Sequence, residues 1–248
     1  MQMFVFVVPF KGRACCSDWS VASELCTNAI ASMLATPSAI RVILVCSEPP
    51  DDLPSDPRLI VKKVFPPTPR TPEEMMVDKG FKIRVGLTIA REFAPTWLMR
   101  ADADDRVSRK LVSFVEEQTP QGAWYAEVGW MHRIGSSYVI KQRDFHTQCG
   151  TSCITYVLAS QIPLTIDEPL DESNLFNQPH HTLVDFLKNC GVPTRPIPFP
   201  TTLYVTDSGE NHSGPWLTAP PSRRIRIRHI LNTRPLTRSL REEFGLAP

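Results

Sequence analysis

Short runs of apolar, largely β-branched residues recur along the first hundred residues of the chain, and a polar loop follows each run. Runs of this length without polar alternation predict strands that are buried on both faces, as in a parallel sheet. Between the runs, apolar positions repeat at the spacing of an amphipathic helix. The predicted strands cover residues 3–9, 40–46, 59–65 and 96–100.

Three helices are predicted in the same half of the chain. The apolar spacing places them over residues 19–34, 73–93 and 108–118, with Pro95 ending the second and Ser108 as the expected cap of the third. A strand–helix–strand order predicts βαβ units, whose strands run parallel. The pattern therefore indicates the α/β class, with a mostly parallel central sheet.

The second half of the chain is less regular. Residues 124–129 and 136–141 have the pattern of antiparallel strands, whereas 153–160 suit either a helix or a strand. A helix over residues 180–190 and a strand over 196–205 that prolines interrupt complete the prediction.

The length of 248 residues and the hydrophobic fraction of 42% are typical of one folded domain. We expect a single domain over residues 1–222, followed by a basic extension over 223–248 that carries seven Arg and two Glu. Its alternating Arg and Ile residues suit a solvated surface strand, or peripheral contact with anionic lipid headgroups. A net charge of +1 and the lack of aromatic residues among these arginines argue against nucleic acid as a partner.

Seven cysteines are scattered without a CxxC pair, which is typical of free thiols in a reducing compartment. No apolar stretch has the length of a membrane-spanning helix, and the apolar start of the chain lacks the basic flank of a signal peptide. We therefore expect a cytoplasmic protein, peripheral to the membrane if the basic extension binds lipid.

An acidic cluster directly follows the predicted strand 96–100. Asp102, Asp104 and Asp105 stand within four residues, and such close carboxylates repel one another unless a cation lies between them. Oxygen ligands suit Mg²⁺ or Mn²⁺, which also bind substrate phosphates, and ligands of open α/β sheets bind beyond the carboxyl ends of strands. Taken alone, the cluster also fits a solvated acidic turn that caps the next helix.

Over residues 3–118 the order of these features resembles the nucleotide-sugar glycosyltransferases of the GT-A fold, especially the family-two group. The resemblance rests on a strand that ends in Pro and a polar turn, a polar loop after the second strand, a basic Gly-containing helix, and the acidic cluster; these are residues 7–11, 46–48, 78–84 and 98–105. It implies a Rossmann-like three-layer sandwich with a mostly parallel central sheet. Residues 1–118 would form the nucleotide-sugar-binding half, and 119–222 the acceptor-binding half.

The resemblance also implies roles for single residues. Residues that would contact the donor nucleotide are Pro9, Phe10, Lys11, Glu48, Lys79, Lys82, Arg84, Asp102 and Ala103. Residues that would bind Mn²⁺ or Mg²⁺ are Asp102, Asp104, Asp105 and His212. The basic residues of the 78–84 helix are equally consistent with an exposed helix face.

The general base is less defined, because the Glu-Asp pair that the resembling proteins carry is absent here. Histidines stand at the expected place, so His180 and His181 are candidates, and Asp185 is either a third candidate or the residue that orients His181 from one helical turn away. Asp171 and Glu172 in the preceding loop are rivals.

By resemblance, the activity is that of a hexosyltransferase-like glycosyltransferase of polysaccharide biosynthesis. It would move a sugar from a UDP-, dTDP- or GDP-linked donor to a carbohydrate or lipid-linked acceptor hydroxyl, with inversion. One alternative is a sugar nucleotidyltransferase, although only Gly12 represents the Gly-rich loop expected after its first strand. Another is a non-catalytic nucleotide-sugar or carbohydrate-binding protein, which the missing Glu-Asp pair allows.

Overall fold

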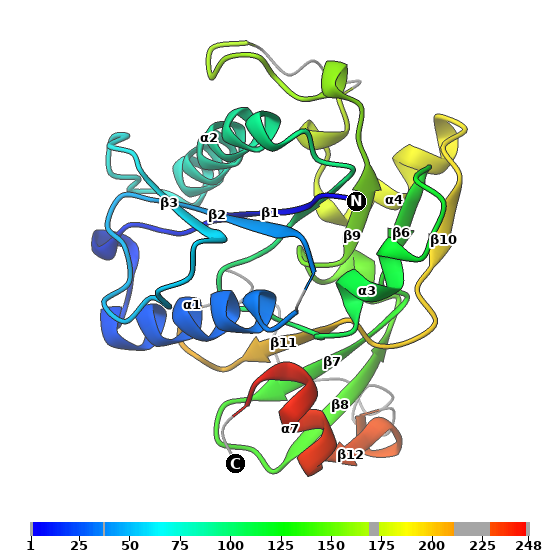
Figure 1. Cartoon of the computed structure of the whole chain (residues 1–248). Coiled ribbons are helices and arrows are strands. Elements are labelled where there is room, and N and C mark those ends of the chain that lie inside the picture. The colour runs from blue at the N-terminus through cyan, green and yellow to red at the C-terminus, as the bar shows by residue number, and fades with distance from the viewer. Residues whose placement is uncertain (1, 37, 169–173, 211–228, 247–248) are drawn as a thin grey trace.

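The computed structural model describes residues 2–36, 38–168, 174–210 and 229–246. A seven-stranded sheet forms its centre, in the order β10-β6-β9-β4-β1-β2-β3 (Figure 1). β1 runs parallel to both of its neighbours, β2 also runs parallel to β3, and β9 is antiparallel to β4 and β6. The strands are β1 (Phe4–Pro9), β2 (Ile40–Cys46), β3 (Leu59–Lys63), β4 (Trp97–Arg100), β6 (Ala123–Tyr125), β9 (Cys153–Tyr156) and β10 (Thr194–Pro196).

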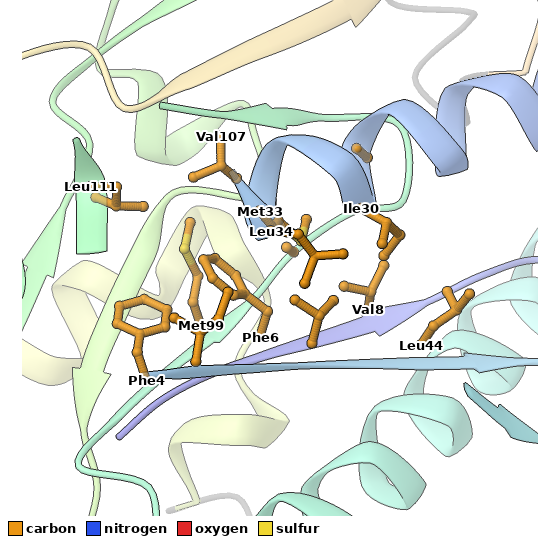
Figure 2. Close-up of a cluster of buried hydrophobic side chains, with 14 of the residues drawn as sticks. Phe4, Phe6, Val8, Ile30, Met33, Leu34, Leu44, Met99, Val107 and Leu111 are labelled. Carbon is orange, nitrogen blue, oxygen red and sulfur yellow. The ribbon is translucent and has the colours of Figure 1, made fainter. Parts of the chain in front are cut away.

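Helices cover both faces of this sheet. Figure 1 shows α1 (Trp19–Leu34) and α2 (Pro72–Ala90) on opposite sides of β1 to β3. The side chains of β1 alternate between two buried clusters: Phe4, Phe6 and Val8 pack against α1 and α3 (Leu111–Glu116), as Figure 2 shows. Val5 and Val7 pack against α2 and α4 (His180–Asn189) on the other face. The predicted three-layer α/β arrangement with a mostly parallel central sheet is therefore confirmed.

Local sequence features explain where the two long helices begin and how closely one of them packs. The Asp18 carboxylate accepts hydrogen bonds from the first backbone amides of α1, and Thr71 caps α2 in the same way, with Pro72 in the first turn. Gly86 lets α2 lie directly on β1, because a Cβ atom there would stand 2.4 Å from Cγ1 of Val7. This close approach brings the polar end of α2 to the carboxyl ends of the strands.

A second sheet of five strands packs beside the first, in the order β12-β8-β7-β11-β5. α7 (Arg238–Phe244) covers it, and Phe244 is buried with Leu203 and Val139. The described part of the basic extension therefore belongs to this sheet layer, whereas residues 223–228 lie outside the described residues. The strands are β5 (Arg106–Val107), β7 (Val128–Arg133), β8 (Tyr138–Arg143), β11 (Thr202–Thr206) and β12 (Thr233–Pro235).

No helix among the described residues is long and apolar enough to cross a membrane.

Single 3-10 turns join several of the helices and strands. One turn, η2, continues the end of α2, and η4 follows β9, so the ambiguous 153–160 segment is a strand and then a turn. The turns are η1 (Arg13–Cys15), η2 (Arg91–Phe93), η3 (Phe145–Thr147), η4 (Ala159–Gln161) and η5 (Leu175–Asn177).

Three local predictions differ from the structure. The predicted strand over residues 124–129 is two strands in different sheets, β6 in the first and β7 in the second. Ser108 is not the N-cap of α3, which is Lys110, but its hydroxyl accepts a hydrogen bond from the Lys110 amide at 3.3 Å. The same hydroxyl donates to Glu243 of α7 at 2.7 Å. Residues 196–205 do not form one interrupted strand, because β10 belongs to the first sheet and β11 to the second. The two predicted strands divide because their parts pair into different sheets, which a local pattern cannot show.

Candidate functional site

A cavity of about 350 Å³ opens at the carboxyl ends of β1 and β4. The residues just after these strands form its floor, and α2, the segment before β9, the first residue of α4 and the region around β11 form its walls. The acidic cluster stands at the end of β4 and meets other residues of the predicted site in this cavity. The predicted polar residues that line it are Lys11, Lys79, Lys82, Asp102, Asp104 and His180. Such a place is where open α/β sheets bind their ligands.

Asp102 is held on three sides within this cavity. Its Oδ1 accepts a hydrogen bond from Lys79 Nζ at 2.5 Å, and its backbone amide donates to Oγ1 of Thr151 at 2.8 Å. Its Oδ2 lies against Gly150, where a Cβ atom would stand only 2.3 Å away. Although burial acts to raise it, the pKa of Asp102 is lowered by the charge and hydrogen bond of Lys79. Asp102 is therefore ionised and fixed in direction.

Asp104 also lines the cavity but has a different electrostatic environment. Burial and the neighbouring Asp102 carboxylate raise the pKa of Asp104 to about 6, and Lys79 and Lys11 offset only part of this. A divalent cation between the two carboxylates would remove their repulsion. No three His, Cys, Asp or Glu side chains of the described residues converge to hold a metal by themselves. Two carboxylates nonetheless fit a cation that takes its other ligands from water and phosphate, as Mg²⁺ commonly does.

Asp105 is turned away from the cavity into the protein. It is fully buried, and its Oδ2 accepts hydrogen bonds from Thr151 Oγ1 at 2.6 Å and from Cys149 Sγ at 3.2 Å. Burial, followed by the charge of Asp104, raises the pKa of Asp105 far above its ordinary range. Metal binding through Oδ2 would require these bonds to break, whereas Oδ1 is buried and has no hydrogen-bond partner among the described residues. A metal role for Asp105 stays a prediction.

The basic residues of α2 divide into two groups. Lys79 and Lys82 both line the cavity, but Lys82 is 1% exposed and forms an ion pair with Asp78 at 2.7 Å. Arg84 lies half-buried on the same helix and does not line the cavity. The spacing of the sequence could not separate these three residues, because the separation depends on which face of α2 meets β1.

The predicted contacts of the nucleotide separate in the same way. Pro9, Phe10, Lys11 and Ala103 line the cavity. Glu48 does not, and its carboxylate instead accepts a hydrogen bond from the Arg13 amide at 3.0 Å.

Of the base candidates that the structure describes, His180 alone lines the cavity. Burial lowers the pKa of His180, and the charge of Asp102, which acts to raise it, does not compensate. His181 and Asp185 are exposed. The pKa of Tyr125 is raised, first by burial and then by the charges of Glu127 and Asp185. The rival bases Asp171 and Glu172, and the predicted metal ligand His212, lie outside the described residues.

Glu210 is a cavity residue that sequence reasoning missed. Its carboxylate is 3% exposed, forms an ion pair with Lys11, and accepts a hydrogen bond from the Asp18 amide at 2.6 Å. Lys11 Nζ also donates to the Glu210 backbone carbonyl at 2.8 Å. Glu210 lies 199 residues from Lys11 along the chain, so no local pattern could have joined them. Its only signal was its place in the polar loop that carries His212.

No protein-family model matches the chain, and no curated protein matches it. Among solved structures, S. aureus TarS 1-349 is 13% identical with a TM-score of 0.46, covering 83% of this chain and 60% of that one. Its complex with UDP-GlcNAc is 12% identical, with the same TM-score. Francisella tularensis 2-C-methyl-D-erythritol 4-phosphate cytidylyltransferase is 10% identical with a TM-score of 0.41, covering 85% of this chain and 93% of that one. This chain thus spans about 60% of the TarS structure's length.

Proposed function

We propose that the protein is a metal-dependent glycosyltransferase that moves a sugar from a nucleotide-diphosphate donor to an acceptor hydroxyl. The observation that carries the proposal is the meeting of two carboxylates, a lysine and an uncharged histidine in one cavity. Asp102, Asp104, Lys79 and His180 line the same space at the carboxyl ends of parallel strands. Each of these groups has a task in the transfer of a group from a diphosphate.

The carboxylates are placed to hold a divalent cation that is shared with the donor. Asp104 has a raised pKa because burial and Asp102 disfavour its charge, so a cation there would stabilise the ionised form. Bound Mn²⁺ or Mg²⁺ would neutralise charge on the departing diphosphate. Lys79 keeps Asp102 ionised and in place through its 2.5 Å hydrogen bond. Lys11 also lines the cavity, where its charge is paired with that of Glu210.

His180 is the group best placed to accept the acceptor's proton. Since burial lowers its pKa below the ordinary 6.5, its imidazole is uncharged near neutral pH. An uncharged ring nitrogen can accept the hydroxyl proton while that oxygen attacks the anomeric carbon. Direct attack of this kind inverts the configuration at the anomeric carbon.

Two measurements test the proposal. Thermal-shift or calorimetric titration with UDP, GDP, dTDP and CDP, each with and without Mn²⁺, identifies the nucleotide; we expect one of them to bind tightly only with the metal. The matching nucleotide-sugar is then assayed for products. Released nucleoside diphosphate supports a glycosyltransferase, whereas formation of a nucleotide-sugar and pyrophosphate from a nucleoside triphosphate and a sugar phosphate identifies a nucleotidyltransferase.

The matched variants are Asp104→Ala and Asp185→Ala. The first removes a carboxylate from the cavity, and the second removes an exposed one on α4 that does not line the cavity. We expect Asp104→Ala to abolish transfer and donor hydrolysis, and Asp185→Ala to retain both. Full turnover by Asp104→Ala, or by the native protein in excess chelator, would exclude the metal role. Metal-dependent binding without any turnover would favour a non-catalytic binding protein.

A further inference from the structure

The segment before β9 lies directly against the acidic loop. β9 pairs antiparallel with β4, with Met99 opposite Ile154, and the same register carried forward puts Asp102 opposite Thr151. Thr151 is fully buried although it lies next to the cavity. Its position is set by the sheet on one side and by a hydrogen bond from Thr202 Oγ1 of β11 to its carbonyl, 2.7 Å long, on the other.

The Thr151 hydroxyl joins the two ends of the acidic loop. Its Oγ1 accepts a hydrogen bond from the Asp102 amide at 2.8 Å and donates one to Asp105 Oδ2 at 2.6 Å. The backbone closes the same turn, because the Asp105 amide donates to the Asp102 carbonyl at 3.3 Å. Only a hydroxyl can accept at one end and donate at the other from this position. A valine of the same shape could do neither.

The two residues before Thr151 act on the same loop. Cys149 Sγ donates to Asp105 Oδ2 at 3.2 Å, so this oxygen accepts from two side chains. Gly150 leaves room for the Asp102 carboxylate, because a Cβ atom would stand 2.3 Å from its Oδ2. Residues 149–151, of which Cys149 and Thr151 are buried, therefore support the loop that presents Asp102 and Asp104 to the cavity.

We propose that Thr151 is a positioning residue for the metal-binding carboxylates, and that Asp105 is its buried partner instead of a metal ligand. This inference rests on the proposed function for the metal, but its structural part does not. Through one hydroxyl, Thr151 holds the Asp102 amide and the Asp105 carboxylate, and so fixes the position of the loop that carries Asp104. Partners of this kind commonly change metal affinity about 10-fold to 100-fold when they are removed.

The test compares Thr151→Val, Thr151→Ser and Asp105→Asn in the full chain. Binding of Mn²⁺ alone is followed by electron paramagnetic resonance, and the exchange rate of the Asp102 amide hydrogen is followed by NMR in chelator. We expect Thr151→Val to weaken Mn²⁺ binding by about tenfold or more and to speed exchange by about tenfold. Thr151→Ser keeps the hydroxyl and should restore both. Asp105→Asn keeps an acceptor for Thr151 and should bind Mn²⁺ within about threefold of the native protein.

Thr155→Val is the control for a purely structural effect. Thr155 is also buried on β9, and its hydroxyl donates to the Leu98 carbonyl at 3.4 Å, away from the acidic loop. It should lower the melting temperature without changing Mn²⁺ affinity. Native Mn²⁺ affinity in Thr151→Val, or a loss in Asp105→Asn as large as in Asp104→Asn, would overturn the inference.

The two proposals fail separately in this design. If the native protein binds no Mn²⁺, the proposed function fails, and the exchange measurement still decides the positioning role. Faster exchange of the Asp102 amide in Thr151→Val but not in Thr155→Val supports that role. An unchanged rate in Thr151→Val contradicts it.

Discussion

Replacing Asp104 by Asn should make the metal-free protein more stable, although it removes a residue that we expect to be essential for activity. The cause is the carboxylate pair in the cavity. Asp104 is half-buried beside Asp102, and burial and this neighbour raise its pKa from the ordinary 3.8 to about 6. The folded state therefore opposes ionisation of Asp104, and an amide of the same shape avoids this cost.

The size of the effect follows from the pKa difference. A carboxyl group whose pKa rises from 3.8 to about 6 on folding costs about 3 kcal/mol of stability when ionised, at about 1.4 kcal/mol per pH unit. Partial exposure and solvent screening reduce this to about 1–2 kcal/mol. Because the folded-state pKa is the higher one, the cost grows as pH rises from 3.8 to about 6 and is constant above. The gain in Asp104→Asn should therefore be full at about pH 7.5 and should fall toward zero near pH 4.

Asp102→Asn is the matched control and should act in the opposite direction. Although burial opposes it, Lys79 lowers the pKa of Asp102, so the ionised carboxylate stabilises the fold at neutral pH. The amide would leave Lys79 Nζ without its 2.5 Å charged partner. We expect a loss of about 1 kcal/mol or more, which disappears as pH falls through the lowered pKa.

Urea denaturation in chelator, repeated at about pH 7.5, 6, 5 and 4, measures both variants. Equal stability of Asp104→Asn and the native protein across this range would refute the electrostatic reasoning. A pH-independent gain would also refute it, because it would come from packing. Added Mn²⁺ should stabilise the native protein and leave Asp104→Asn unchanged.

Three further predictions concern the base and the packing around the cavity. His180→Gln should lower kcat about 100-fold or more with donor affinity nearly unchanged, whereas His181→Gln, at an exposed position, should remain active. The pH–rate profile of the native protein should rise through a pKa below 6.5. Equal activity of the two variants would exclude His180 as the base. Gly86→Ala should lower the free energy of unfolding by about 1–3 kcal/mol in urea denaturation, because the new Cβ would stand 2.4 Å from Val7. Gly80→Ala, whose Cβ meets nothing within 4 Å, should raise it by up to about 1 kcal/mol. The reverse order would contradict the packing of α2 on β1. Lys82→Met should lower the free energy of unfolding by about 3 kcal/mol or more, because it leaves the Asp78 carboxylate without its 2.7 Å partner. The Lys110 side chain is 59% exposed, so Lys110→Met should lower it by less than about 1 kcal/mol in the same assay. Similar losses in the two variants would show that burial does not strengthen the Lys82 ion pair.

The sequence by itself predicted most of the first half of the fold, although it missed the short strand β5. The apolar runs predicted β1, β2 and β4 almost to the residue, and the helical spacing predicted α1 over residues 19–34. These elements are set by short-range patterns, since a strand buried on both faces must be apolar throughout and a helix on a sheet must repeat its apolar face. The place of the acidic cluster followed from the end of β4 for the same reason.

Only the tertiary structure decided what each polar residue of the cavity does. Asp104 and Asp105 are adjacent in the sequence, yet one lines the cavity and the other bonds to Thr151 beneath it. Lys11 meets Glu210 from the other end of the chain. A local sequence pattern predicts which face of a helix or strand is buried, because many apolar side chains repeat on that face. The direction of a single charged side chain depends on its partners, and here the fold brings those partners from segments 23 to 199 residues away.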